Sequence, residues 1–346
     1  MIEALLMTTT TETRTKRLTY NRTIGVAAMQ GRGFYYPWAV SVAADGRYFV
    51  LGRGSDSDPR GTRYTVMDFD EQYYGTFGAF GKGEGQSLWN ACTVIDSAQR
   101  LYQSDESLHR IIVRNLDGDL LDTWGEYGSD EGQLNGPTGI AVTAEDELLI
   151  VDHQNGRIQK FTGNGKYVSS FSAPGSGDGQ LNLPWGICVG PAGDIYVADW
   201  GNDRVTKFSG DGEFITNYGS SGSGEGEFNA PSSVAVDDDG YVYVADWANQ
   251  RVQVLDPDGA FVQLTRGEST NSKWAEEFLD TNVEERAARA GANLEPDLEF
   301  NTNDPHEQSA HIEKYFWGPT HLALDNDGHL LIVDSNRHRL QVFDVG

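Results

Sequence analysis

A unit of about 47 residues recurs along the chain, and this repeat limits the possible folds more than any other feature. Four similar stretches read PTGIAV, PWGICV, PSSVAV and PTHLAL, and they begin at Pro137, Pro184, Pro231 and Pro319. The first two intervals are 47 residues each, and the third is 88 residues because it holds 41 extra residues. Two weaker copies start at Pro37 and Asn90, which gives six units. A repeat of this period predicts a chain of like supersecondary units that bury their apolar faces against one another.

Each unit contains four short segments with the composition of β-strands. In the Pro184 unit these segments are WGICVG, IYVAD, RVTKF and EFITNYG, separated by the turns PAGD, WGND and SGDG. The segments are rich in Val, Ile and Tyr, and Gly and Asp bound them, as is typical of strands and tight turns. Four-stranded units repeated at this length are typical of propeller blades. We therefore expect an all-β fold, a six-bladed β-propeller of four-stranded blades, that forms a single domain over residues 18–346.

The two ends of the chain predict how the ring closes. The sixth unit ends at RLQVFDVG without a fourth strand, whereas RLTYNRTIG lies ahead of the first unit and matches a fourth strand. We expect this N-terminal strand to complete the last blade, because pairing there removes an open sheet edge. Residues 1–17 are expected to form a disordered polar lead. An insertion at about 268–314, between the fifth and sixth units, contains a helical pattern and is expected to lie over the mouth of the central channel.

Charge and cysteine content narrow the class of protein. The 26 basic and 52 acidic residues give a formal net charge of −26, which repels the phosphate backbone and argues against nucleic-acid binding. The sequence contains no apolar run long enough to span a membrane, so no membrane partner is expected. The two cysteines, Cys92 and Cys188, imply no disulfide framework and favour a reducing, cytoplasmic location.

An Asp and an Arg recur at fixed positions, 15 and 20 residues after the proline slot. Because they recur in almost every unit, a structural ion pair across the turn between the second and third strands is favoured over a catalytic role. The pairs are Asp105 and Arg110, Asp152 and Arg157, Asp199 and Arg204, Asp246 and Arg251, and Asp334 and Arg339.

Positions that differ between units carry more information about function. Trp38, Trp185 and His321 follow the proline slot at the start of innermost strands, and His153, Trp200 and Trp247 follow the motif Asp. Both sets should face the channel mouth, on the face where the insertion also emerges. Aromatic residues at a concave mouth suit recognition of a protein or a small ligand, and the alternative is that they pack between blades.

The stretches LLIVDHQNGRIQKF, IYVADWGNDRVTKF, VYVADWANQRVQVL and LLIVDSNRHRLQVF resemble the NHL-repeat family of six-bladed propellers. The family resemblance covers residues 18–346 except the insertion and implies the fold. It implies no single function, because relatives include RNA-binding and ubiquitin-ligase propellers, peptidyl-hydroxyglycine amidating lyases and scaffolds.

The amidating lyases hold zinc with three histidines around the axis, whereas here only His321 occupies such a position. A different zinc site is conceivable from His306, His311 and His321. A calcium-dependent lactonase would need axial carboxylates, which the inner-strand starts lack. We expect a ligand- or protein-binding propeller that needs no cofactor. The alternative is a metal-dependent lyase or hydrolase with zinc, or less readily calcium, at the channel mouth.

Overall fold

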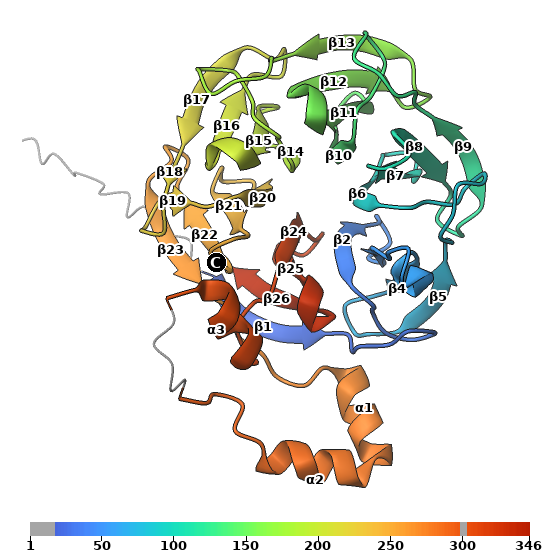
Figure 1. The fold of residues 1–346 in the computed structure, drawn as a ribbon, viewed down its shortest axis with the longest axis vertical. Helices are drawn as coiled ribbons and strands as arrows, with labels where there is room; N and C mark the ends of the chain where they lie inside the picture. Colours follow the sequence, from blue (N-terminus) through green and yellow to red (C-terminus); the bar gives the residue numbers. More distant parts are fainter. Residues whose placement is uncertain (1–17, 298–302) are drawn as a thin grey trace, which may run out of the picture.

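Six four-stranded sheets surround a central axis in the computed structural model, which describes residues 18–297 and 303–346 (Figure 1). Blade one consists of β2 (Pro37–Val42), β3 (Tyr48–Gly52), β4 (Tyr64–Met67) and β5 (Tyr73–Phe77). Blade two consists of β6 (Asn90–Ile95), β7 (Leu101–Asp105), β8 (Arg110–Arg114) and β9 (Leu120–Trp124). Blade three consists of β10 (Pro137–Val142), β11 (Glu147–Asp152), β12 (Arg157–Thr162) and β13 (Tyr167–Phe171). Blade four consists of β14 (Ile187–Val189), β15 (Ile195–Asp199), β16 (Arg204–Phe208) and β17 (Phe214–Tyr218). Blade five consists of β20 (Pro231–Val236), β21 (Val242–Asp246), β22 (Arg251–Leu255) and β23 (Phe261–Thr265).

The sixth blade joins the two ends of the chain. Its strands are β24 (Pro319–Leu324), β25 (His329–Asp334), β26 (Arg339–Val345) and β1 (Leu18–Ile24). Strand β1 pairs antiparallel with β26, from Leu18 opposite Val345 to Ile24 opposite Leu340. The predicted six-bladed, all-β fold and its closure by the N-terminal strand are therefore confirmed, and blue β1 lies beside red β26 in Figure 1.

The core lies between neighbouring blades rather than at the axis. All five residues of β15 are buried, because both faces of an inner strand meet an adjacent blade, whereas only the two end residues of the outer strand β13 are half-buried and the rest are exposed. Between blades three and four, Leu149 and Val151 pack with Ile187 and Val197. Each such cluster fixes one blade against the next, so the loops at the ends of the strands stand on a rigid ring.

The turn between the second and third strands of a blade forms a short 3₁₀ helix in four blades: η1 (Pro59–Gly61), η2 (His153–Asn155), η3 (Trp200–Asn202) and η4 (Ser335–Arg337). These turns lie on the same face as the linkers between blades, since the chain enters each blade where the second strand ends. One linker also contains the short parallel pair β18 (Ser220–Ser221) and β19 (Glu227–Phe228). We call this the linker face.

The insertion is partly helical, with α1 (Lys273–Thr281), α2 (Val283–Gly291) and α3 (Pro305–His311). The expectation that it covers the channel mouth is wrong: α1 and α2 lie outside the ring, beyond β1 (Figure 1). Trp274 of α1 is 1% exposed and packs against Phe34 and Tyr73, and its Nε1 donates to the carbonyl of Glu71 at 2.7 Å. Burial of this one tryptophan against blade one holds α1 at the outer edge.

Two further expectations from the sequence concern the N-terminal residues and helices that could span a membrane. The expected polar lead, residues 1–17, lies outside the described residues. None of the helices within residues 18–297 and 303–346 is long and apolar enough to cross a membrane.

Candidate functional site

The recurring Asp and Arg residues form the frame of the linker face. In four blades the Arg Nε donates to the Asp carboxylate at 2.7–2.9 Å, in the pairs Asp152–Arg157, Asp199–Arg204, Asp246–Arg251 and Asp334–Arg339. In blade four, Arg204 also donates to the carbonyls of Ser176, Gly177 and Gln180, which belong to the preceding linker. The pair therefore ties the turn both to itself and to the linker.

Blade two uses the same two residues differently. Asp105 accepts hydrogen bonds from the backbone N–H groups of Leu88 and Trp89, while Arg110 donates to the carbonyls of Gly83 and Gln86. The Nε of Arg110 is buried and has no hydrogen-bond partner within residues 18–297 and 303–346. The weak second copy of the repeat thus keeps the ties to the linker without the ion pair that the sequence predicted there.

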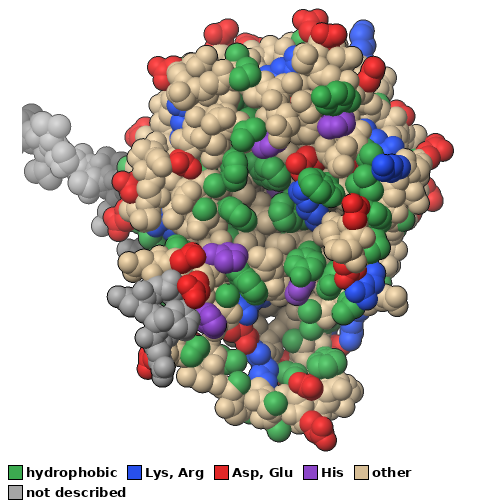
Figure 2. All heavy atoms as spheres, in the orientation of Figure 1, with side chains coloured by type: hydrophobic (Ala, Val, Ile, Leu, Met, Phe, Trp, Pro, Cys, Tyr) green, Lys and Arg blue, Asp and Glu red, His purple; other side chains and the backbone are tan. Residues whose placement is uncertain are grey.

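The four tryptophans singled out from the sequence converge on one hollow of about 160 Å³ on the linker face. Trp38 belongs to β2, Trp185 precedes β14, Trp200 begins η3 and Trp247 follows β21, so three blades contribute. We call this hollow the four-tryptophan pocket; Ser232 and Thr320 complete its lining. Figure 2 shows hydrophobic side chains gathered around the hollow centre of this face, with many acidic side chains toward its periphery.

The two hydroxyl groups in this pocket are engaged as donors, whereas, among the described residues, the buried Nε1 of Trp38 has no hydrogen-bond partner. Ser232 Oγ donates to the carbonyl of Pro319 at 2.9 Å, and Thr320 Oγ1 donates to the carbonyl of Trp38 at 2.9 Å. The rings of Trp38 and Trp185 meet at an interplanar angle of 65°, with centroids 6.5 Å apart. The pocket therefore offers mainly aromatic surface, and its lining residues contribute no charged side chain.

One wall of the pocket is supported by an ion pair that sequence reasoning missed. The guanidinium of Arg53 lies 4.6 Å from the ring centroid of Trp38 and 5.2 Å from that of Trp89. Its Nη2 donates to Glu106 at 2.7 Å, and both side chains are 16% exposed. Arg53 directly follows the slot where the motif Asp is replaced by Gly52, and a cation after that irregular slot was the available signal.

His153 stands behind the pocket instead of lining it. It is 5% exposed, and its Nδ1 lies 3.0 Å from the carbonyl of Pro184, to which it donates. Its ring meets that of Trp185 nearly edge to face, with centroids 5.1 Å apart. His153 thus orients Trp185.

His321 lines the channel on its inner wall. Its Nδ1 accepts from the N–H of Val40 at 3.5 Å, and its Nε2 lies 3.7 Å from Sγ of Cys92. Burial lowers the pKa of His321 to about 4 and raises the pKa of Cys92 to about 11. Both groups are therefore neutral near pH 7, which gives this Cys–His contact no thiolate for nucleophilic chemistry.

The three histidines proposed as zinc ligands are not brought together. His306 is exposed on α3 and accepts from Nε1 of Trp317 at 3.1 Å, while His311 is exposed at the end of the same helix. Within the described residues, the group of metal-ligand side chains that converges is a different one, Asp325, Asp327 and His329. The geometry therefore gives the zinc site of His306, His311 and His321 no support.

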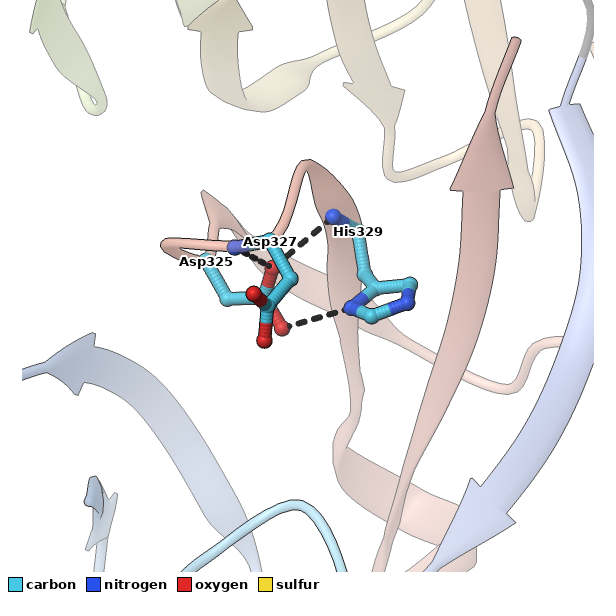
Figure 3. A group of neighbouring side chains, drawn as sticks. All are labelled: Asp325, Asp327 and His329. Carbon is cyan, nitrogen blue, oxygen red and sulfur yellow. Dashed lines mark hydrogen bonds and ion pairs between the residues drawn. The ribbon is translucent and has the colours of Figure 1, made fainter. Parts of the chain in front are cut away.

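Asp325, Asp327 and His329 form the turn between β24 and β25, on the face opposite the linker face (Figure 3). Asp325 accepts from the backbone N–H groups of Asp327 and His329, from Nδ1 of His329 at 2.8 Å and from the hydroxyl of Tyr48 at 2.6 Å. Burial alone would raise the pKa of Asp325, but these hydrogen bonds hold it below its usual value. Asp237 accepts in the same way from Asp239 and Tyr241, so the arrangement is a repeated turn.

Comparison with known proteins agrees with this architecture. A family model described as the NHL repeat matches residues 134–161, 181–208, 228–255 and 316–343, which span the first three strands of blades three to six. No curated protein matches the chain.

Several solved structures share the fold. A catalytically inactive virginiamycin B lyase from Staphylococcus aureus with quinupristin is 12% identical, with a TM-score of 0.56 over 95% of this chain and 99% of that one. A gluconolactonase from Xanthomonas campestris gives the same identity, score and shares. A protein of unknown function from Bacteroides thetaiotaomicron is 15% identical, with a TM-score of 0.59 over 96% of this chain and 76% of that one.

Identities this low establish a common fold and leave the function to the residues of the site. The matched repeats and the ring of six sheets lead to the same conclusion: the chain contains NHL repeats in a six-bladed β-propeller.

Proposed function

We propose that this propeller is a non-catalytic binding protein that holds an apolar group of its ligand in the four-tryptophan pocket. The observation that carries the proposal is the convergence of Trp38, Trp185, Trp200 and Trp247 from three blades on one hollow. Exposing a large apolar tryptophan ring to water is unfavourable, and a concave group of such rings is typical of ligand-binding sites.

The surroundings of the pocket support binding rather than catalysis. The neighbouring side chains of His321 and Cys92 are both neutral near pH 7. The hydroxyls of Ser232 and Thr320 donate to backbone carbonyls, so neither is paired with a base that would activate it. A pocket of aromatic rings whose hydroxyls already donate to backbone carbonyls recognises its ligand through apolar contact area and shape.

The proposal is tested by titrating the protein with indole and with benzyl alcohol while following ligand NMR signals. We expect saturable binding that weakens at least fivefold in Trp247→Leu, because this ring is 37% exposed and its loss removes a wall without disturbing the core. Phe278→Leu is the control, since Phe278 is 51% exposed on α1, outside the ring, and does not line the pocket. Absence of binding by the wild type, or equal weakening in both variants, would refute the proposal.

A further inference from the structure

We propose that the four-tryptophan pocket recognises a quaternary ammonium group of a small molecule. This inference rests on the proposed function and adds the chemical class of the ligand. It follows from three properties of the pocket taken together: the chemistry of its walls, the small number of hydrogen-bond acceptors among its lining side chains, and the charge of the protein around it.

The walls of the pocket are tryptophan rings, and tryptophan is the side chain best suited to bind a cation. Tryptophan has the strongest attraction for a cation over its ring face. Trp38 already holds one, because the guanidinium of Arg53 lies 4.6 Å from its ring centroid. Within the described residues, Trp200 and Trp247 form no ring pair with another aromatic side chain, so their faces are available to a ligand.

The hydrogen-bonding groups decide which cation fits. The six lining residues contribute no carboxylate, amide or histidine, and their two hydroxyls donate to the carbonyls of Pro319 and Trp38. A primary ammonium or a sugar would find only the two hydroxyl oxygens as side-chain acceptors, so it would lose most of its hydrogen bonds to water on entering such a site. A quaternary ammonium has no N–H group, so it loses no hydrogen bond of this kind.

Charge and size agree with this class. The net charge of −26 attracts cations toward the protein, and the ion pair of Arg53 with Glu106 beside the pocket adds no net charge. The hollow of about 160 Å³ is close to the engineered cavity of about 150 Å³ that binds benzene, so a trimethylammonium head fits within it. The hollow is lined by residues of four blades, which favours a small molecule over a group carried on a flat protein surface.

The inference is tested with two ligands of the same shape. Choline and 3,3-dimethylbutan-1-ol differ in a positive nitrogen against a neutral carbon, so their affinities separate the effect of charge from that of apolar area. We expect choline to bind roughly tenfold more tightly to the wild-type protein by calorimetry or NMR titration. Trp200→Leu and Trp247→Leu keep an apolar wall but remove a ring face, and each should reduce this ratio at least threefold. Phe278→Leu, on α1 outside the ring, should leave the ratio unchanged.

The possible results distinguish the inference from the proposed function. Equal affinity for the two ligands overturns the charge inference and leaves an apolar binding pocket, whereas failure of choline and also of indole overturns both. Choline binding that neither tryptophan variant alters places the cation elsewhere and overturns the inference. A trimethyllysine peptide that binds far more tightly than choline overturns the small-molecule assignment. Because two variants are used, misfolding of Trp200→Leu, detected by circular dichroism, still leaves the more exposed Trp247 as a test.

Discussion

Replacing Arg204 by Met should destabilise the whole ring, because it leaves a buried carboxylate without its counter-ion. The Asp199 side chain is 0% exposed and accepts from Arg204 Nε at 2.9 Å. Removing one partner of such a buried ion pair lowers the free energy of unfolding by about 3–5 kcal/mol. Asp199 keeps two other donors, the N–H of Asn182 and Nδ2 of Asn202, both at 2.7 Å, so we expect the lower end of that range.

The expected loss of about 3 kcal/mol corresponds to a fall in Tm of about 4 °C, because the unfolding entropy of a 346-residue chain is about 0.7 kcal/mol/K. The three linker carbonyls that Arg204 also contacts can be hydrated, so they add little. Thermal and urea unfolding followed by circular dichroism measure the loss. The double variant Asp199→Asn/Arg204→Met should recover at least 1 kcal/mol relative to Arg204→Met, since it no longer buries an unpaired charge.

The pH dependence provides a second check on the same mechanism. Burial raises the pKa of Asp199 in the folded protein, above its value in the unfolded chain, so the folded state binds more protons and its stability falls as pH rises through that pKa. Loss of Arg204 raises the pKa further. The destabilisation should therefore be larger at pH 8 than at pH 5. A loss below 1 kcal/mol, or one that is the same at both pH values and fully additive in the double variant, would refute the reasoning.

Three other outcomes follow from the structure. Because burial holds the pKa of His321 at about 4 against 6.5 in the unfolded chain, stability should fall by about 3 kcal/mol as pH drops from 6.5 to 4, and His321→Gln should remove that component from the urea-unfolding curve. A chain starting at Gly25 lacks β1 and exposes the edge of β26, so size-exclusion chromatography should detect association that a chain starting at Leu18 does not show. Trp274→Ala should cost about 3–5 kcal/mol locally, and hydrogen exchange should then speed up in α1 while blades two to five keep their protection.

The fold could be predicted from the sequence because each level of evidence agreed. The proline, Asp and Arg slots kept a period of 47 residues, and the missing fourth strand of the last unit matched the spare strand at Leu18–Ile24. The framework role of Asp199 and Arg204 was also readable, since a group repeated around a ring meets the same neighbours in each blade. The linker face could be assigned from strand topology alone.

Features that depend on irregular contacts could not be predicted. The insertion reads as helical, but its position is set by one buried contact, Trp274 with Glu71 and the rings of blade one, whose partners lie some 200 residues away in sequence. Arg53 was missed because blade one replaces the motif Asp by Gly52 and carries extra residues after it. The histidine set failed for a related reason: closeness in sequence within an irregular segment does not fix where side chains point.

The turn after the second strand shows how a repeated frame can produce a unique site. Its first residue is His153 in blade three, Trp200 in blade four and Trp247 in blade five, and in all three blades the preceding Asp is held by the same Arg. The Asp–Arg pair therefore fixes the position of this residue in the turn, while the chemistry of its side chain determines the contacts that it makes. His153 donates to the carbonyl of Pro184 and supports a wall, whereas the indoles of Trp200 and Trp247 have no hydrogen-bonding partner among the described residues and line the pocket. Because Trp200 is positioned by the Asp199–Arg204 pair, ligand affinity should fall together with stability in Arg204→Met, although Arg204 does not line the pocket.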